Sequence, residues 1–416
     1  MTTTKNNEHE KNQGRKVLNV PNLRFPEFQG EWEKCELGEF ATIIGGYAFK
    51  SETLNNIGGK YQVVKMGNLY QNQLDLHRSP SYTDTLTRKA ENVILRKDDI
   101  AITLTGTNNK RDFGYTYIFN DEKNLLLNQR CGLIRAKGNP YFLSCLLKTH
   151  TFLNQFFESA TGGTGNQANV STKAMEMFSV NTPSLKEQEK IGQLMALLDE
   201  RIATQNKIID KLQSLIKGIN QRVFRNNGIN YKLGEVCEIR SGYSGNQLLS
   251  KKGLKVSRIE TISGHKVNLE RVGYVAPFES SENYKLQVGD ILFSNINSVE
   301  YIGNTAFIDK DYDLYHGMNL LRLTPNNMVV IPFYLYLLLN TNRMLNRFKT
   351  VCNKAVSQAS INQTELGKTV VQIPDINAQK QICELYQTLY DKLESEKYAN
   401  SLFQKQKLYL LRQIFI

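Results

Sequence analysis

The clearest pattern in the chain is a run of apolar residues at helical spacing between Leu185 and Phe224. The run contains no proline, and its aliphatic side chains recur in steps of three and four, as on one face of an α-helix. Such a helix would be roughly 60 Å long. Because it cannot bury its own apolar stripe, the pattern predicts a partner helix. The expected contact residues are Ile191, Leu194, Leu198, Ile202, Ile209, Leu212 and Ile216.

The C-terminal stretch 376–416 repeats this pattern and is the expected partner. Its contact residues should be Ile382, Leu385, Leu389, Leu393, Phe403 and Leu410. Asn400 and Lys407 stand where the first stretch has Ile209 and Ile216. Polar residues inside such a stripe tend to fix the register of the two helices at some cost in stability.

Each helical stretch follows a segment with the pattern of a mixed α and β domain. Short β-branched runs, such as 62–66, 99–104 and 115–119, alternate with breaks at Gly, Asn and Asp, as strands do. Helical spacing returns at 140–157. These patterns do not reveal the order of the strands.

The chain is an internal repeat. The segment 37–47 (LGEFATIIGGY) recurs as 233–243 (LGEVCEIRSGY), and 140–156 recurs as 332–348. We therefore expect two homologous α/β domains, each followed by a long helix. Homologous units usually pair about a two-fold axis, so the helices should form an antiparallel coiled coil with one domain near each end. The expected ranges are 1–16 for a disordered leader, 17–182 and 226–373 for the domains, and 183–225 and 374–416 for the helices.

Charge and composition narrow the function. The chain has 416 residues, with 52 Lys and Arg against 40 Asp and Glu, which gives a net charge of +12 and favours an anionic partner, with nucleic acid first. Six scattered cysteines without a CxxC pair suggest neither a zinc site nor disulfides, as in a cytoplasmic protein. No signal peptide or membrane-spanning stretch is visible, so no membrane partner is expected.

Candidate catalytic motifs are weak. The sequence Gly367-Lys-Thr369 resembles the end of a phosphate-binding loop, but Asn362 stands where that loop needs glycine. Asn139-Pro-Tyr-Phe142 partly matches an amino-methyltransferase motif, yet the repeat lacks the asparagine, and a helix start explains it better. No metal-ligand spacing or catalytic triad emerges. We therefore predict no catalytic residue and no metal site.

Several polar and basic segments of the first domain have the residue types that contact DNA. Phosphates are bound by Lys, Arg and small polar groups, and base edges by Arg, Asn and Gln. The candidate loops are 103–111, 128–130 and 161–171, of which the last is glycine-rich. The candidate contacts are Tyr47, Lys65, Thr105, Thr107, Asn108, Lys110, Arg111, Gln129, Arg130, Gln167 and Asn169. Each of these candidates has an alternative interpretation. The loop 103–111 could be a solvated turn, the segment 161–171 a linker, and Tyr47 a packing residue.

The second domain offers a different set at corresponding places. Its candidate contacts are Tyr243, Arg258, Asn295, Asn297, Ser298, Tyr301, Asn319, Lys354 and Gln358. Arg258 corresponds to Lys65, and the loop 294–301 carries a glutamate instead of the basic pair at 110–111. Different loops on similar frames would read different sequences. The lone Trp32 and the aromatic residues of 25–28 are expected to pack at the edge of the first domain.

Three segments resemble the specificity subunit of type I restriction-modification systems. They are VPNLRFPEF at 20–28, followed by Trp32 and by Leu37-Gly-Glu39, then TGGTGNQANVS at 161–171, and PSLKEQEKI at 183–191. The resemblance covers about residues 17–416 and is carried by the order and repetition of the motifs. The second copy departs from it at Ala378, which replaces Glu187. This difference predicts unequal contacts for the two helices.

The resemblance implies a non-catalytic subunit with two target recognition domains, each of which reads one half of a split DNA sequence. The helices would act as a ruler and as the docking surface for two methyltransferase subunits, which restriction subunits would join. S-adenosylmethionine, ATP and magnesium would belong to those partners. Two alternatives stay open: a coiled-coil scaffold whose domains bind protein or an anionic surface, and the recognition portion of a fused methyltransferase, for which the chain has no spare length.

Overall fold

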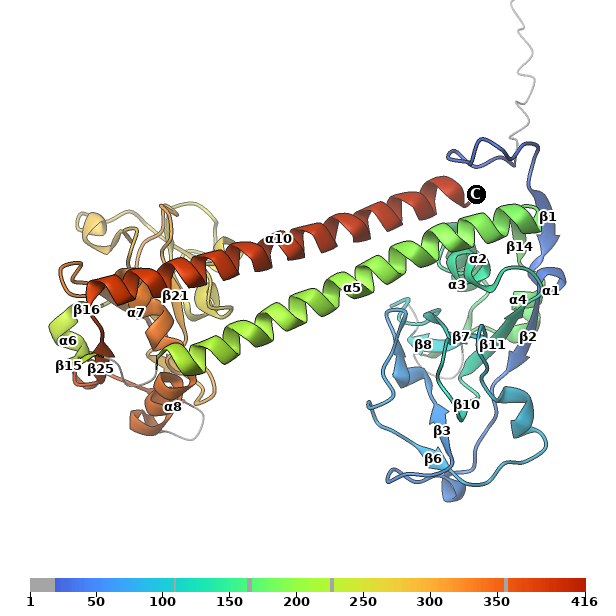
Figure 1. Cartoon of the computed structure of the whole chain (residues 1–416), viewed down its shortest axis with the longest axis horizontal. Helices are drawn as coiled ribbons and strands as arrows, with labels where there is room; N and C mark the ends of the chain where they lie inside the picture. The colour runs from blue at the N-terminus through green and yellow to red at the C-terminus, as the bar shows by residue number, and fades with distance from the viewer. Residues whose placement is uncertain (1–18, 108–109, 163–166, 225–227, 355–357) are drawn as a thin grey trace, which may run out of the picture. The chain divides into compact units, whose positions relative to one another are not determined.

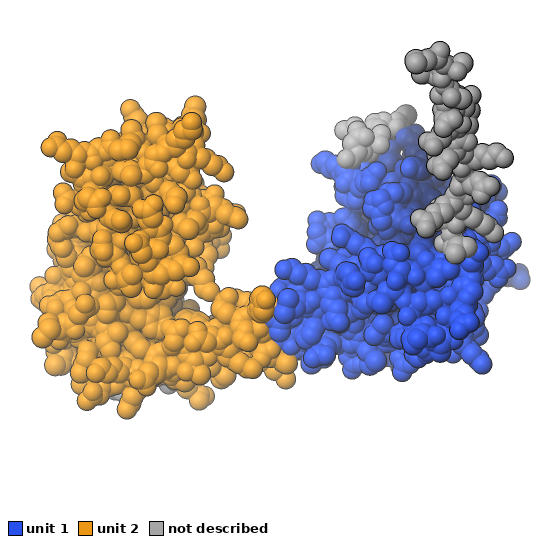
Figure 2. Space-filling view, turned by 90° about the horizontal axis from the view of Figure 1, so that it is seen from above, with its two compact units in different colours: residues 1–206, 399–416 blue, residues 207–398 orange. Residues whose placement is uncertain are grey.

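The computed structural model describes residues 19–107, 110–162, 167–224, 228–354 and 358–416. They form two compact units, residues 1–206 with 399–416 (unit 1) and residues 207–398 (unit 2), which Figure 2 colours separately. Both boundaries between the units fall inside long helices, α5 (Leu185–Val223) and α10 (Ile376–Ile414). Each helix therefore contributes one part to each unit. The expected leader 1–16 lies outside the described residues.

Unit 1 is built around an antiparallel sheet in the order β2-β11-β7-β9. Smaller sheets have the orders β1-β14, β10-β3-β6, β4-β5 and β12-β13-β8. The strands are β1 (Glu33–Glu36), β2 (Ala41–Gly45), β3 (Tyr61–Val64), β4 (Leu69–Tyr70), β5 (Gln73–Leu74), β6 (Tyr82–Thr83), β7 (Ile100–Thr103), β8 (Thr105–Thr107), β9 (Thr116–Ile118), β10 (Leu125–Leu127), β11 (Cys131–Ala136), β12 (Thr161–Gly162), β13 (Gln167–Asn169) and β14 (Ser179–Thr182). The short helices are α1 (Leu37–Phe40), α2 (Pro140–Leu146), α3 (His150–Glu158) and α4 (Thr172–Glu176). Unit 1 is thus the mixed α and β fold that the sequence predicts.

Unit 2 repeats this plan, with a central antiparallel sheet in the order β16-β22-β19-β21. Its smaller sheets have the orders β15-β25, β17-β18 and β20-β24-β23. The strands are β15 (Ile229–Lys232), β16 (Cys237–Ser241), β17 (Leu254–Val256), β18 (Gly273–Val275), β19 (Ile291–Phe293), β20 (Ile296–Asn297), β21 (Thr305–Phe307), β22 (Leu321–Pro325), β23 (Asn353–Lys354), β24 (Ala359–Ser360) and β25 (Val370–Ile373). The short helices are α6 (Leu233–Val236), α7 (Pro332–Leu339), α8 (Asn342–Val351) and α9 (Gln363–Gly367). The internal repeat seen in the sequence is therefore a repeat of structure.

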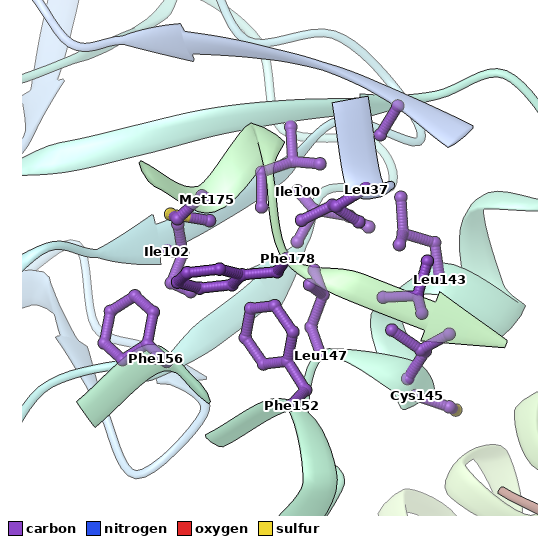
Figure 3. Packing of buried hydrophobic residues seen from close by; sticks show 14 of the residues in the cluster. Leu37, Ile100, Ile102, Leu143, Cys145, Leu147, Phe152, Phe156, Met175 and Phe178 are labelled. Atoms are coloured by element: carbon purple, nitrogen blue, oxygen red, sulfur yellow. The ribbon is translucent and has the colours of Figure 1, made fainter. Parts of the chain in front are cut away.

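The main core of unit 1 lies between the central sheet and helices α2 and α3 (Figure 3). Ile100 and Ile102 of β7 meet Phe152 and Phe156 of α3 in this cluster, and all four side chains are buried. All four residues of β7 are buried, and Ala101, which points to the other face of the strand, belongs to a separate apolar cluster. In unit 2 a core around Phe293 of β19 and Phe348 of α8 occupies the corresponding place.

A buried glutamine joins each long helix to the α2 or α7 start of its own unit. Gln188 accepts a hydrogen bond from the Asn139 amide at 3.1 Å and donates to the Pro183 carbonyl at 2.8 Å. Gln379 does the same with the Ile331 amide and the Pro374 carbonyl, at 2.8 and 2.9 Å. Asn139 also accepts from the Phe142 amide, so its interpretation as a helix start is confirmed. The glutamine repeated in the sequence thus fixes where each long helix leaves its domain.

Within each unit, α5 and α10 pack against each other in opposite directions (Figure 1). In unit 1 the first turns of α5 meet the last turns of α10, with Ile191, Leu194 and Leu410 in the shared core. In unit 2 the last turns of α5 meet the first turns of α10. The expected contact residues in that cluster are Ile209, Leu212, Ile216, Ile382, Leu389 and Leu393. The predicted helix pairing is therefore present in both units.

One predicted contact residue was wrong. Leu385 is 42% exposed, whereas Tyr386 beside it is fully buried and its hydroxyl donates to Asn220 at 2.9 Å. From Ile382 the helix can continue its buried face at i+3 or i+4, and the larger side chain at i+4 fills the space. Of the remaining assigned residues, Leu198 is buried, Ile202 is half-buried, and Phe403 lies under the Arg201 guanidinium at 4.4 Å.

The two polar residues expected between the helices find polar partners there. Asn400 donates to the side-chain oxygen of Asn206 at 2.9 Å. Lys407 forms an ion pair with Asp199, which also accepts from the Tyr141 hydroxyl. Because these pairs form in one alignment of the helices, they favour a single register.

Unit 1 has an N-terminal segment, residues 19–32, for which the described residues of unit 2 offer no counterpart. Arg24 forms a bidentate ion pair with Glu187 of α5, with both N···O distances at 2.8 Å, and the Trp32 indole donates to the same carboxylate at 3.3 Å. Trp32 is 2% exposed and packs on Phe142 and Phe415, which confirms its packing role. Ala378, which replaces Glu187 in unit 2, thus marks the place where no such segment docks.

Candidate nucleic-acid interface

Most of the candidate DNA contacts of unit 1 lie at one end of its central sheet. β2 and β7 end there and β11 begins there. The amide of Gly46 bonds to the Cys131 carbonyl at 2.9 Å, and that of Leu104 bonds to the Arg130 carbonyl at the same distance. The segments around Tyr47, Thr105 and Arg130 are therefore neighbours, although up to 83 residues separate them in the sequence.

The repeated Gly–Tyr pair forms the same crossing in both units. Tyr47 makes an isolated parallel bridge with Asn128, and Tyr243 makes one with Gly317. The glycine before each tyrosine is required, because a Cβ on Gly46 or Gly242 would collide with the carbonyl of that partner. This crossing sets the position of the loop that follows, Gln129 and Arg130 in unit 1 and Asn319 in unit 2.

The main contacts of both tyrosines are packing contacts with other aromatic rings. The Tyr47 ring packs edge-on against Phe49 at 4.8 Å and borders a buried cluster. Tyr243 stacks on Phe278, with ring centroids 3.9 Å apart and planes 9° apart. Each side chain is half-buried. Their rings support the loop beside them, which agrees with the packing alternative considered from the sequence.

Lys65 and Arg258 begin equivalent turns, as expected. The Lys65 amide donates to Asn68 Oδ1 at 2.8 Å, and the Arg258 amide donates to Thr261 Oγ1 at 2.9 Å. Asn68 and Thr261 are buried, and each donates onward to a loop carbonyl, that of Arg78 or Arg271. These buried anchors hold the basic residue in place at the surface in each unit.

In unit 2 two of the candidate residues line a polar cleft of about 440 Å³. Arg258 and Asn319 lie in its wall together with Asn246, Gln247 and Glu260. The last three are not among the residues predicted from the sequence; the run Ser244-Gly-Asn-Gln247 after the Gly–Tyr pair was the available signal for Asn246 and Gln247. Five side chains with donors and acceptors thus converge on one opening.

The loop 103–111 and the glycine-rich segment of unit 1 come together in the sheet β12-β13-β8. Its register places Thr107 opposite Gln167 and Thr105 opposite Asn169. Thr105 donates to Asn169 at 3.0 Å, whereas the amide and hydroxyl of Thr107 both donate to Asp112. The bond from the Thr107 amide, above all, lowers the pKa of the Asp112 carboxyl. Gln167 and Asn169 stay exposed, so they are better placed than the threonines to meet a ligand.

Unit 2 builds the matching sheet from β20, β24 and β23. Asn297 lies opposite Ala359, which also faces Lys354, and the Asn297 side-chain Nδ2 donates to the Ser294 hydroxyl at 3.1 Å. Of the other candidates in this region, Ser298, Tyr301 and Gln358 are exposed, and Asn295 is half-buried with its side-chain oxygen enclosed. The two units therefore carry the same frame with different polar residues.

The remaining candidates differ in how far they are constrained. Lys110 and Arg111 are exposed, and the Arg111 guanidinium lies 5.1 Å from the centre of the Phe157 ring. Gln129 and Arg130 are also exposed. Asn108 lies outside the described residues, and for Lys354 only the backbone is described.

A buried histidine supports the cleft of unit 2. The His316 carbonyl accepts from the Tyr243 amide, and its Nε2 lies 2.9 Å from the Leu320 carbonyl across the turn that carries Asn319. Burial lowers the pKa of His316 to about 4, although the contact with Leu320 acts in the opposite direction. This histidine is therefore neutral at physiological pH and serves the turn, not the surface.

The described ranges also bear on metal binding and on membrane spans. Within them, no group of three or more His, Cys, Asp or Glu side chains is placed to hold a metal ion. The helices found there include none that is both long and apolar enough to cross a membrane.

Known proteins with the same features identify the family. The family model of the type I restriction modification DNA specificity domain matches residues 29–214 and again residues 229–401. A protein of Methanocaldococcus jannaschii assigned as the specificity subunit of type I restriction enzyme MjaX is 42% identical over 158 residues, which span 37% of each chain. The MjaVIII specificity subunit of the same organism is 23% identical over 92% of this chain and 91% of its own.

A solved structure has the same fold. The S subunit of a type I restriction-modification system from M. genitalium matches with a TM-score of 0.60 and 16% identity, over 95% of this chain and 99% of its own. The two family matches cover most of the chain and coincide with its two structural repeats. The chain therefore belongs to the family of type I restriction modification DNA specificity domains and carries two copies of that domain.

Proposed function

We propose that this chain is the DNA sequence-recognition subunit of a type I restriction-modification complex and acts in the cytoplasm. Each unit would read one short half-site of a split target in double-stranded DNA. The observation that carries this proposal is the repeated group of polar and basic residues at the same sheet end of both units, with Lys65 matched by Arg258. The net charge of +12 supports an anionic partner.

Differences between the units favour sequence reading over general DNA binding. Gln129 and Arg130 of unit 1 correspond to Met318 and Asn319 of unit 2, on the same Gly–Tyr crossing. Phosphate contacts carry little sequence information, whereas base edges are read by side chains of specific shape. Two similar frames with different side chains suit a target made of two different blocks.

The long helices support a docking role for two methyltransferase subunits, which restriction subunits would join. Large apolar side chains stay exposed on α5 and α10 in both units: Leu197, Ile208, Leu215, Leu385, Tyr398, Leu402, Leu408 and Tyr409. Exposed apolar surface of this kind marks protein contact sites. In this proposal the partners bring S-adenosylmethionine, ATP and magnesium, and this chain supplies no catalytic residue.

A genome-wide map of methylated bases tests the proposal. Cells that carry this chain with its methyltransferase should show a motif of two short defined blocks around a fixed gap, and cells without the chain should lose it. A motif that persists without the chain would assign recognition to another protein. The scaffold alternative would then be the reading to pursue.

A further inference from the structure

The two equivalent turns at the candidate interface differ in one charged side chain. In unit 1 the turn is Lys65-Met-Gly67 ahead of Asn68, and in unit 2 it is Arg258-Ile-Glu260 ahead of Thr261. The matching amide bonds of Lys65 and Arg258 fix this alignment, so Glu260 stands where unit 1 has Gly67. The space around a Cβ at Gly67 is open within 4 Å. Unit 1 thus has room for a side chain there but carries none.

Glu260 is held firmly and faces the cleft. It lies in the 3-10 helix η4 (Ile259–Ile262), whose Thr261 and Ile262 are at most 1% exposed. Its side chain is 56% exposed and meets Arg258, with Nε and Oε2 3.5 Å apart. Together with Asn319 it lines the polar cleft. A turn anchored by two buried residues therefore presents an accessible carboxylate beside an arginine.

The Glu260 carboxylate contributes little to the stability of the fold. An ion pair in which both partners are about half exposed contributes little to stability, because water screens it and both side chains lose freedom. At a surface that meets DNA, a carboxylate is also repelled by phosphates. It gains only where it can accept a hydrogen bond, and in the major groove the amino group of cytosine is the donor that suits it.

We infer that Glu260 is a specificity-determining residue, which accepts a hydrogen bond from the amino group of a cytosine in the half-site read by unit 2. The inference rests on the proposed function. Arg258 holds the carboxylate toward the cleft and reduces its repulsion from neighbouring phosphates. Because unit 1 has Gly67 at this position, its half-site carries no equivalent requirement.

The variant Glu260→Gln tests the inference in the complete complex with its methyltransferase. Glutamine keeps one acceptor oxygen but replaces the other with an NH2 donor, which can pair with adenine as well, so we expect the methylation map to lose cytosine selection at one position of one block, with every other position unchanged. The purified variant complex, titrated with duplexes that differ at that base, should lose roughly tenfold in discrimination, which is the order expected when one hydrogen bond to a charged acceptor is weakened. This ratio of affinities stays measurable even if the variant methylates more slowly.

The matched control is Glu365→Gln. Glu365 is also exposed and paired with a lysine, Lys368 at 2.8 Å, but α9 packs on α6 at the other end of the central sheet. This variant should keep the complete motif. If Glu260→Gln also keeps it, or relaxes a position that is not cytosine, or weakens all duplexes equally, the inference is overturned while the proposed function stands. If the unaltered chain yields no split motif, the proposed function fails and the inference falls with it.

Discussion

His316 and Leu127 occupy equivalent places in the two units and make the same backbone contact with different side chains. Each carbonyl accepts a hydrogen bond, at 2.9 Å, from the amide of the tyrosine in the repeated Gly–Tyr pair. Leu127 is fully buried, and His316 is 1% exposed. The frame therefore tolerates either side chain, but only the histidine can bind a proton.

This difference predicts a pH dependence that belongs to unit 2. The pKa of His316 is about 4 in the folded chain, below the ordinary value of roughly 6.5. The unfolded chain therefore takes up a proton first as the pH falls, so the contribution to stability is complete above pH ~6.5 and declines toward pH ~4. From pH 7.5 to pH 5 the loss should be about 2 kcal/mol.

The variant His316→Leu, which introduces the residue found at the equivalent position 127 of unit 1, should remove this pH-dependent part of the stability. Urea unfolding followed at pH 7.5 and pH 5 would show a smaller loss of stability for the variant than for the unaltered chain. Replacing the exposed His150 with Gln is the control and should keep the original dependence. An unchanged dependence in His316→Leu would mean that other groups cause the acid sensitivity.

At the scale of elements, the buried face of α10 can be tested by two neighbouring residues. Tyr386 is fully buried and Leu385 is 42% exposed. Tyr386→Ala should destabilise unit 2 by about 3–5 kcal/mol, because it leaves a large cavity and an unpaired Asn220. Leu385→Ala should stay within about 0.5 kcal/mol. Thermal unfolding of both variants measures the two losses of stability. Losses of similar size would contradict the assignment of Tyr386 to the buried face.

The ion pair of the N-terminal segment gives a second prediction at this scale. Glu187 is buried and its partner Arg24 is 13% exposed, so Glu187→Ala leaves a nearly buried cation without its counterion. We expect a loss of about 3–5 kcal/mol in the stability of unit 1. The double variant Arg24→Met with Glu187→Ala should recover most of this stability, because it leaves no unpaired charge. Unit 2 has the same apolar arrangement, with Ala378 at the position of Glu187. Chemical unfolding of the three chains measures this. A double variant as unstable as the single one would contradict the reason given.

The sequence predicts elements better than it predicts neighbours. The helices, their polar positions Asn400 and Lys407, and the repeat follow from periodicity, which is local information. The cleft residues Asn246 and Gln247 could not be found this way, because their meeting with Arg258 depends on the Gly–Tyr crossing of the chain. Thr107 shows the converse, since its residue type suits DNA while Asp112 engages its donors.

At the scale of the whole molecule, duplication supplies two sets of contacts that can change independently. The candidate groups belong to different units, and the positions that differ between them lie on loops, while the buried anchors Asn68 and Thr261 do the same work in both. A substitution in one group thus leaves the other frame untouched. Under the proposed function, the second half-site could then change without loss of the first.

This independence predicts additive effects on DNA binding. Arg130→Ala in unit 1 and Arg258→Ala in unit 2 should each weaken binding of the complete complex to its target, because each removes an exposed cation from a candidate interface. If both units contact the same duplex and share no partner, the losses in binding free energy should add to within about 0.5 kcal/mol in the double variant. The complexes of the unaltered chain, the two single variants and the double variant are titrated with one duplex, which gives the four binding free energies. The salt concentration is held fixed, because phosphate contacts depend on it. If the second substitution costs nothing once the first is present, only one unit engages DNA at a time, and the two-block target would have to be abandoned.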